Sequence, residues 1–328
     1  MPFKGVGIDT DAEDLNGSLA KLESKLELFA SLGFESVELQ LAGINVVRGG
    51  EVNKEELNRL LKITRRFPFQ YTCHAPNALN IAGGRNVELH LKAFDAYLYV
   101  CSCLEAEVFV YHSGQNSLNY PLLEYGGLPS KADLHQRWEI EIERLKRKAL
   151  LAENLGVVIT IENMDPQLSE ILFLAEFGVP ESELAVYNRA LRLDLLAQQV
   201  KEINSPNVGL CLDVGHAFLA APYWPDDDYL AAIESCAFQV KHVHFHDNFG
   251  HLADVAETEC ERLALGEADN HLPPGWGRIP LAEVVSILGR SGYNGWLTLE
   301  ICPRYEMYLE EALKAVRDLI AHSHKLGA

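Results

Sequence analysis

The chain has 328 residues, of which 48% are hydrophobic and 23% are charged, a composition that excludes intrinsic disorder. Its 28 basic and 47 acidic residues give a formal net charge of −19, which argues against a broad surface for nucleic acid or anionic membrane. Seven cysteines without a C-x-x-C pair, no signal-peptide pattern and no apolar run of membrane-spanning length predict a reduced, cytoplasmic protein with no membrane partner.

Segments rich in β-branched residues alternate with segments of helical periodicity along the whole chain. The predicted strands are residues 5–9, 36–41, 69–74, 107–112, 157–162, 208–213, 240–246 and 296–301. The predicted helices are residues 17–32, 53–66, 86–103, 131–155, 181–203, 227–237, 280–290 and 306–325. Strict alternation predicts a parallel sheet of the α/β class, and eight strands are the number that closes a TIM barrel.

No linker or shift in composition divides the chain, so we predict one (β/α)8 barrel domain over residues 1–328. Gly33, Gly156 and Gly292 stand where helices should end, as glycine commonly does. The long connections at 113–130, 163–180 and 247–279 all follow strands. They therefore belong to the C-terminal face of the barrel, where loops of this length are usually functional.

The third to the eighth predicted strands each carry a histidine or a carboxylate near the C-terminal end. These residues are His74, His112, Glu162, Asp213, the alternating His242, His244 and His246, and Glu300. Side chains of a strand alternate between its two faces. If Glu162 points into the barrel, Thr160 does so too, while Ile161 faces the helices. The pattern therefore predicts a polar site at the mouth of the barrel.

Carboxylates and imidazoles gathered at one mouth are costly unless they are satisfied, and a divalent metal satisfies them well. The loop 269–279 adds an Asp-x-His pair, Asp269 and His271. Each residue alone has a structural interpretation. A strand-end histidine can simply be hydrogen-bonded, Glu162 can cap the next helix, and His216 can be a residue at a helix N-terminus. His242 should lie deeper in the barrel in a structural role. Taken together, the residues favour metal binding by a subset of them.

Five segments carry a resemblance to a known family. They are Ile161-Glu162-Asn163, Cys211-Leu212-Asp213-Val214-Gly215-His216, His244-Phe245-His246-Asp247-Asn248, residues 269–279 and Leu299-Glu300. The chain resembles the xylose isomerase-like barrel superfamily, which includes sugar-phosphate isomerases and epimerases, inosose dehydratase, hydroxypyruvate isomerase and the endonuclease-IV type of apurinic-site nuclease. In the isomerases and epimerases, the resemblance implies one divalent metal held by Glu162, Asp213, His244 and Glu300. The family's His-x-x-Asp pattern, which ends here at Asp247, favours His244, and His246 is the alternative ligand.

The nuclease type uses nine ligands for three zinc ions, and each has a counterpart here. They are His74, His112, Glu162, Asp213, His216, His244, Asp269, His271 and Glu300. The resemblance therefore implies one to three ions, zinc or manganese. The net charge and the segment 164–167, which is not glycine-rich, oppose a nuclease. Gly250 stands where the sugar epimerases have an arginine, so we name neither tagatose nor psicose as substrate.

These features predict a metal-dependent isomerase or epimerase of a sugar, sugar phosphate or other small polyhydroxy carbonyl compound. Glu162 and Glu300 would transfer a proton through a metal-stabilised enediolate, and His216 would hydrogen-bond or polarise a substrate oxygen. Trp276 would form a wall beside the substrate, or else it packs against other side chains. Arg278 would bind a phosphate or carboxylate of the substrate, or else it pairs with an acidic side chain.

Three alternatives stay open beside this function: a dehydratase that uses the same site, a nuclease-type phosphodiesterase, and a non-catalytic scaffold. The apolar residues of 171–180 indicate either a cover over the mouth or contact with a second copy in a homo-oligomer, and packing within a loop helix is an equal alternative.

Overall fold

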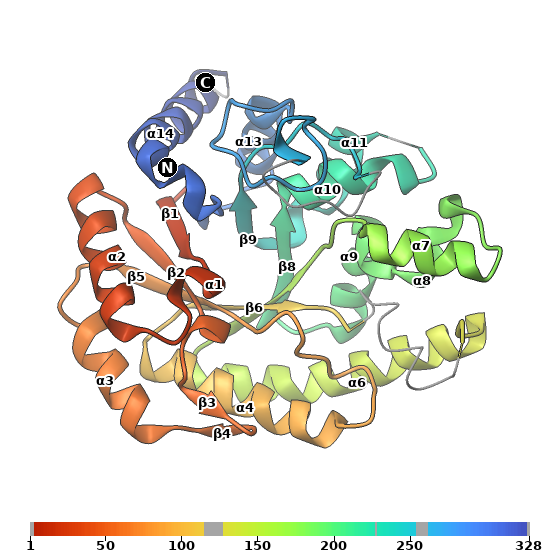
Figure 1. Cartoon of the computed structure of the whole chain (residues 1–328), viewed down its shortest axis with the longest axis horizontal. Helices are drawn as coiled ribbons and strands as arrows, with labels where there is room; N and C mark the ends of the chain where they lie inside the picture. The colour runs from red at the N-terminus through yellow and green to blue at the C-terminus, as the bar shows by residue number, and fades with distance from the viewer. Residues whose placement is uncertain (1–2, 115–126, 227, 254–261, 327–328) are drawn as a thin grey trace.

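Eight parallel strands form a closed barrel in the computed structural model, which describes residues 3–114, 127–226, 228–253 and 262–326 (Figure 1). Around the barrel the strands follow one another in the order β1, β2, β5, β6, β7, β8, β9 and β10. Their bounds are Gly5–Thr10, Ser36–Gln40, Gln70–His74, Val108–His112, Val158–Glu162, Val208–Asp213, Val240–Phe245 and Trp296–Leu299. The predicted (β/α)8 barrel is confirmed, and the predicted strand ends differ from these by at most about two residues.

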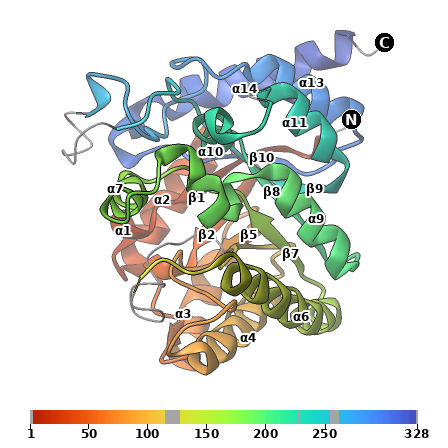
Figure 2. The same cartoon turned by 90° about the vertical axis from the view of Figure 1, so that its right-hand side faces the viewer.

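The long helices lie outside the strands, as the two views in Figures 1 and 2 show. They are α2 (Leu19–Leu32), α3 (Lys54–Thr64), α4 (Val87–Cys103), α6 (Lys131–Leu155), α9 (Leu193–Ile203), α11 (Tyr229–Cys236), α13 (Leu281–Arg290) and α14 (Leu309–Leu326). Gly33 and Gly156 end α2 and α6 in the left-handed conformation, with φ of 88° and 72°, as predicted. None of the described helices combines the length and the apolar character needed to cross a bilayer.

The predicted helix 181–203 is wrong in its first half. The structure has a 3-10 turn at Glu181–Glu183, a short α8 at Leu184–Tyr187 and a second 3-10 turn at Arg189–Leu191 before α9 begins. The break falls at Asn188, whose backbone is extended and whose side-chain amide donates to the buried carboxylate of Glu170 at 3.0 Å. A side-chain hydrogen bond to a distant partner outweighs helical propensity here.

The barrel also has short elements that the sequence pattern did not reveal. They are α1 (Ala12–Leu15), α7 (Leu168–Glu176), α10 (Val214–Ala220), the hairpin of β3 (Val47–Arg48) and β4 (Glu51–Val52), and 3-10 turns at Leu41–Gly43, Ala221–Tyr223, Ala237–Gln239 and Pro303–Tyr308. In the connection 163–180, α7 buries Phe173 and Leu174 and exposes Leu172 and Phe177. Residues 115–126 and 254–261 of the other two long connections lie outside the described residues.

The strands separate two environments, as the predicted alternation requires. Phe109 and Tyr111 of β6 point outward, and each ring packs 5.2 Å from Phe94 of α4. Val108 and Val110 point inward and form a small separate cluster with Cys211 of β8. Above this cluster the inner face turns polar, because His112 follows Val110 at the same parity. Beside β6 and β8 the barrel interior is thus apolar at its base and ionisable at its mouth.

Candidate metal centre

The mouth of the barrel is a cavity of about 640 Å³ at the C-terminal ends of the strands. Its walls come from the strand ends, from the α1 region, and from loop residues after β9 and β10. The ionisable residues that line it are Asp9, Asp11, Glu13, His74, His112, Glu162, His216, Arg262, Asp269, His271 and Glu300. The cavity therefore holds most of the predicted metal ligands.

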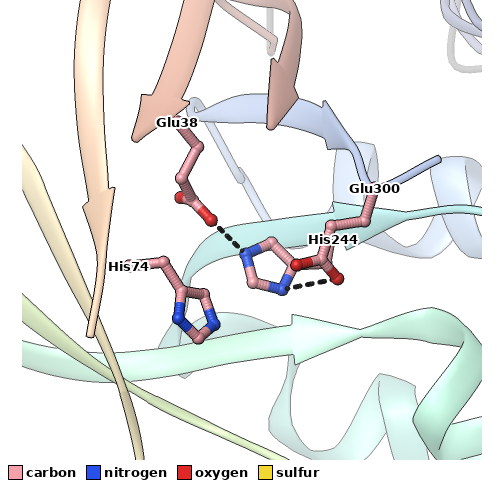
Figure 3. A group of neighbouring side chains, drawn as sticks. All are labelled: Glu38, His74, His244 and Glu300. Atoms are coloured by element: carbon pink, nitrogen blue, oxygen red, sulfur yellow. Dashed lines mark hydrogen bonds and ion pairs between the residues drawn. The ribbon is translucent and has the colours of Figure 1, made fainter. Parts of the chain in front are cut away.

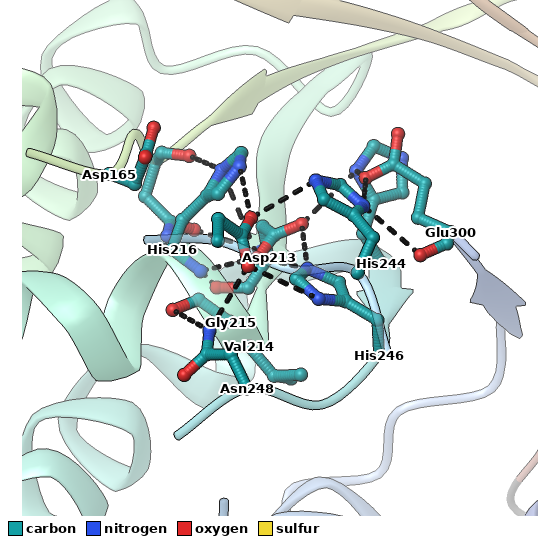
Figure 4. Close-up of polar contacts among 12 residues, drawn as sticks. Asp165, Asp213, Val214, Gly215, His216, His244, His246, Asn248 and Glu300 are labelled. Atoms are coloured by element: carbon teal, nitrogen blue, oxygen red, sulfur yellow. Dashed lines mark hydrogen bonds and ion pairs between the residues drawn. The ribbon is translucent and has the colours of Figure 1, made fainter. Parts of the chain in front are cut away.

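Three carboxylates converge on one ring nitrogen of His244, and Figure 4 labels two of them, Asp213 and Glu300, beside its ring. Nδ1 of His244 lies 2.8 Å from Oε1 of Glu162 and 3.5 Å from Oε2 of Glu300. It lies 3.8 Å from Oδ2 of Asp213. All four side chains are at least 90% buried. The structure thus brings together the four residues that the resemblance implies for a single divalent ion.

A second group forms on the other oxygen of Glu162. Oε2 of Glu162 lies 2.6 Å from Nε2 of His112 and 3.0 Å from Nε2 of His74. Burial disfavours a charged imidazole, yet the hydrogen bond and charge of Glu162 raise the pKa of His74 to about 9. Burial likewise disfavours the carboxylate, but His112 and His244 hold the pKa of Glu162 well below its usual range. Glu162 is therefore an anion shared by three histidines.

A third group sits nearer the opening of the cavity. Oδ2 of Asp269 lies 3.0 Å from Nε2 of His271 and 3.3 Å from Nε2 of His216. The ring of His271 stacks on His246, with centroids 4.2 Å apart and planes 6° apart. His246 in turn places Nε2 at 3.1 Å from both oxygens of Asp213. His246 therefore lies between the central group and this outer one.

Local hydrogen bonds of the backbone and of neighbouring side chains orient the side chains of the site. Helix α10 begins immediately after β8, and Asp213 is its N-cap: its carboxylate accepts a hydrogen bond from the backbone N–H of His216 at 2.7 Å. Asn163, which follows β7, accepts from the Asp213 N–H and donates to the Asp213 carbonyl, both at 2.9 Å. Nδ1 of His271 is 3.0 Å from the Glu300 carbonyl oxygen, which leaves its Nε2 toward Asp269.

The donor chemistry fits a divalent cation. The mouth offers imidazole nitrogens and carboxylate oxygens, which Zn²⁺ and Mn²⁺ accept as ligands. In the described part of the chain, the buried Nδ1 atoms of His112 and His246 have no hydrogen-bond partner, although such groups are normally satisfied. Several sets of side chains place ligand atoms close together, among them Glu38, His74, His244 and Glu300; His74, His112 and Glu162; His216, Asp269 and His271; and His246, His271 and Glu300.

Glu38 joins the site from β2, although the sequence pattern did not single it out. Its carboxylate is completely buried, and its two oxygens lie 2.7 Å from Nε2 of His242 and 2.8 Å from Nε2 of His244. Burial would raise the pKa of Glu38, but the charges of His244 and His242 hold it well below its usual range. The available signal was a charged residue of inward parity inside a buried strand. His242 lies deeper than His244, as predicted.

The two residues predicted to contact substrate lie beside the cavity. Trp276 packs on Tyr305 and Tyr308 and donates from Nε1 to Glu311 at 3.1 Å. Arg278 is exposed. Neither is among the residues that line the described cavity, so their contact with substrate stays a prediction. Arg262 is the one arginine or lysine among the described lining residues, and its buried Nε has no hydrogen-bond partner there.

Residues 26–323 match the family model of the xylose isomerase-like TIM barrel. The chain belongs to this family. A protein of Methanocaldococcus jannaschii is 24% identical over 318 residues, which cover 93% of this chain and 89% of that protein. A solved structure described as a D-tagatose 3-epimerase-like protein superposes with a TM-score of 0.70 at 20% identity, covering 99% of this chain and all of the other.

Two relatives with named activities match parts of this family member. A fructoselysine 3-epimerase of Escherichia coli O157:H7 is 27% identical over 143 residues, 42% of this chain and 51% of that enzyme. An inosose dehydratase of Erwinia tasmaniensis is 33% identical over 122 residues, 36% of this chain and 40% of that enzyme. The matches thus span about half of each named enzyme or less. Relatives in this family are sugar epimerases and inosose dehydratases.

Proposed function

We propose that this family member is a divalent-metal-dependent isomerase or epimerase of a sugar, sugar phosphate or related polyhydroxy carbonyl compound. The observation that carries the proposal is the convergence of Glu162, Asp213 and Glu300 on Nδ1 of His244, with Glu162 and Glu300 lining the cavity at the mouth of the barrel. The epimerase and dehydratase relatives support the class of substrate. The cytoplasmic location and a homo-oligomeric state stay predictions from sequence.

Glu162, Asp213, His244 and Glu300 would hold the first ion, zinc or manganese by their donor types. His74 and His112 could join a second ion with Glu162, while His216, Asp269 and His271 could hold a third. When bound, a divalent ion supplies Lewis-acid stabilisation of negative charge on a substrate oxygen. The donor groups therefore accommodate one to three ions.

The two glutamates have the placement that proton transfer requires. Glu162 ends β7 and Glu300 follows β10, and both side chains line the cavity. One carboxylate removes the proton from the carbon next to the substrate carbonyl, and the electron pair moves onto the carbonyl oxygen to form an enediolate. The other carboxylate returns a proton, to the same carbon on the opposite face in an epimerase or to the neighbouring carbon in an isomerase. His216 faces the same cavity and is placed to hydrogen-bond a substrate oxygen.

Exchange of a substrate carbon proton with solvent deuterium tests this function. The purified protein, loaded with Mn²⁺ or Zn²⁺, is incubated in deuterium oxide with ketoses, inososes and sugar phosphates, and products are followed by NMR. We expect exchange with at least one substrate and a loss of about 100-fold or more in Glu162→Gln. Glu56→Gln is the matched control, because Glu56 is buried on α3 and pairs with Arg59. No exchange with any compound in the panel would overturn the proposal.

Two other activities have specific support. The inosose dehydratase relative favours a lyase that uses the same acid–base pair to expel water, and the same NMR experiment detects its dehydrated product. The outer group of His216, Asp269 and His271 favours the phosphodiesterase alternative with more than one ion. Nicking of an abasic duplex that Glu162→Gln abolishes, without proton exchange on sugars, would establish that alternative instead.

A further inference from the structure

Glu38 occupies a position where an ionised carboxylate is energetically unfavourable. It lies in the middle of β2 and is completely buried inside the barrel. An ionised carboxylate at such a depth costs several kcal/mol unless its oxygens are satisfied. Three groups satisfy them: the hydroxyl of Thr72 donates to Oε2 at 2.9 Å, Nε2 of His242 lies 2.7 Å from Oε2, and Nε2 of His244 lies 2.8 Å from Oε1. Glu38 is therefore fixed from three directions.

The contact between Glu38 and His244 determines the orientation of the His244 ring and which of its nitrogens faces the other carboxylates. A carboxylate only accepts hydrogen bonds, so Nε2 of His244 carries the proton that points at Glu38. The opposite nitrogen, Nδ1, faces Glu162, Glu300 and Asp213. Because Oε1 of Glu162 is only 2.8 Å away, Nδ1 also carries a proton in the metal-free ring, and a cation would replace that proton. Figure 3 shows the ring between Glu38 on one side and Glu300 on the other. Rotating the ring by half a turn would put a carbon atom where Nε2 now meets Glu38.

We propose that Glu38 is a positioning residue of the metal centre, which locks the ring orientation and tautomer of His244 so that Nδ1 presents its lone pair to the cation. The inference rests on the proposed metal site. Histidine ligands commonly donate their second N–H to a carboxylate, and loss of such a partner typically weakens metal binding about 10- to 100-fold. Here that carboxylate comes from β2, which supplies none of the ligands assigned above to the three ions.

Thr72 supports Glu38 from the adjacent strand β5, and His242 supports it from β9, which does not neighbour β2 around the barrel. Thr72 pairs with Glu38 in the register of β5 and β2. The ring of His242 stands almost perpendicular to that of His244, at 87° with centroids 5.3 Å apart. Because His242 and Thr72 both contact Oε2, Oε1 is left to His244 alone. A carboxylate that served only to stabilise the barrel interior would change protein stability but not metal affinity once the variant has folded.

Metal affinity of the whole chain tests the proposal. The metal-free protein is titrated with Zn²⁺ and with Mn²⁺ in competition with a chromophoric chelator, for the wild type, Glu38→Gln and Glu38→Ala. We expect Kd to rise about 10- to 100-fold in Glu38→Ala. The rise should be smaller in Glu38→Gln, because the amide oxygen can still accept from Nε2 of His244. Glu56→Gln, a buried glutamate on the outer layer, should keep the wild-type Kd within about twofold.

The outcomes separate this proposal from the proposed function. If the wild type binds metal and a folded Glu38→Gln and Glu38→Ala bind it within about twofold of the wild type, the positioning role is wrong while the metal site stands. If the wild type binds no metal, both fail. Should Glu38→Ala not fold, Thr72→Val provides the second measurement. This variant removes one hydrogen bond to Glu38 and should raise Kd less than Glu38→Gln does. An unchanged Kd in both Thr72→Val and Glu38→Gln would overturn the proposal.

Discussion

Gly215 lies directly against the ring of His246: a β-carbon at position 215 would stand 2.1 Å from Cε1 of that imidazole. The glycine is the second residue of α10 and is buried. Only a residue without a side chain lets His246 reach the carboxylate of Asp213 at 3.1 Å. The close approach of the Gly215 backbone to the His246 ring thus allows the contact between His246 and Asp213 at the mouth of the barrel.

We expect Gly215→Ala to destabilise the metal-free protein by about 1–3 kcal/mol, because an inserted methyl group must displace a fully buried ring. Denaturant unfolding measures the change. Gly289→Ala is the control: its β-carbon would meet only Phe3 at 3.9 Å, and alanine is the better helix former inside α13. Equal stability of the Gly215→Ala variant and the wild type would show that His246 is not held where the structure places it.

Removal of metal should lower the thermal midpoint of the wild type. The mouth concentrates Glu162, Asp213, Asp269 and Glu300 in a small buried volume, and a bound cation offsets their mutual repulsion. At a free metal concentration of about 100 times Kd, binding adds about 2.7 kcal/mol to the free energy of unfolding. Calorimetry before and after chelator treatment, with Zn²⁺, Mn²⁺ and Mg²⁺ restored separately, measures the effect. A midpoint indifferent to chelator would refute a metal centre.

The fold could be predicted because strand and helix periodicities are local signals. Thr160 and Glu162 point inward and Ile159 and Ile161 join the outer core, as alternation along a strand demands. The gathering of His74, His112 and Glu162 followed from the same rule, since parallel strand ends meet at one face. Glu38 was missed because it lies mid-strand and not at a strand end, and its one signal was inward parity within a buried strand.

Loop residues could not be placed in the same way. Trp276 and Arg278 belong to the connection after β9, whose path has no periodicity to follow. The structure folds residues 275–279 around the carboxylate of Asp247, which accepts from the backbone N–H groups of Gly275, Gly277 and Ile279. That turn directs Trp276 toward Tyr308. Long-range hydrogen bonds decide the outcome here, and composition does not reveal them.

His244 and His246 should differ in their effect on metal binding. Nδ1 of His244 faces three carboxylates, whereas Nε2 of His246 meets only Asp213. We expect His244→Ala to lose the tightest ion, with Kd raised by at least about 100-fold, and His246→Ala to keep it with a smaller loss. Metal content per chain after dialysis, together with chelator competition, measures both. His135→Ala, on the exposed face of α6, is the control. The reverse order of effects would make His246 the ligand.

Arg262 should set the affinity for substrates that carry a phosphate or carboxylate. It lines the cavity at the mouth of the barrel with a buried Nε that has no hydrogen-bond partner among the described residues, and guanidinium pairs strongly with such anions. Loss of one charge-assisted hydrogen bond of about 1.5–3 kcal/mol corresponds to a rise of about 10-fold or more in KM. We therefore expect Arg262→Met to raise KM for a ketose phosphate, to leave KM for the parent ketose nearly unchanged, and to keep kcat. Arg278→Met is the matched control, because Arg278 is exposed outside the cavity. Deuterium exchange kinetics on the ketose and its phosphate provide both constants. If Arg278→Met shows the larger effect on the phosphate, the loop after β9 closes over the substrate and Arg278 binds the anion, as the sequence predicted.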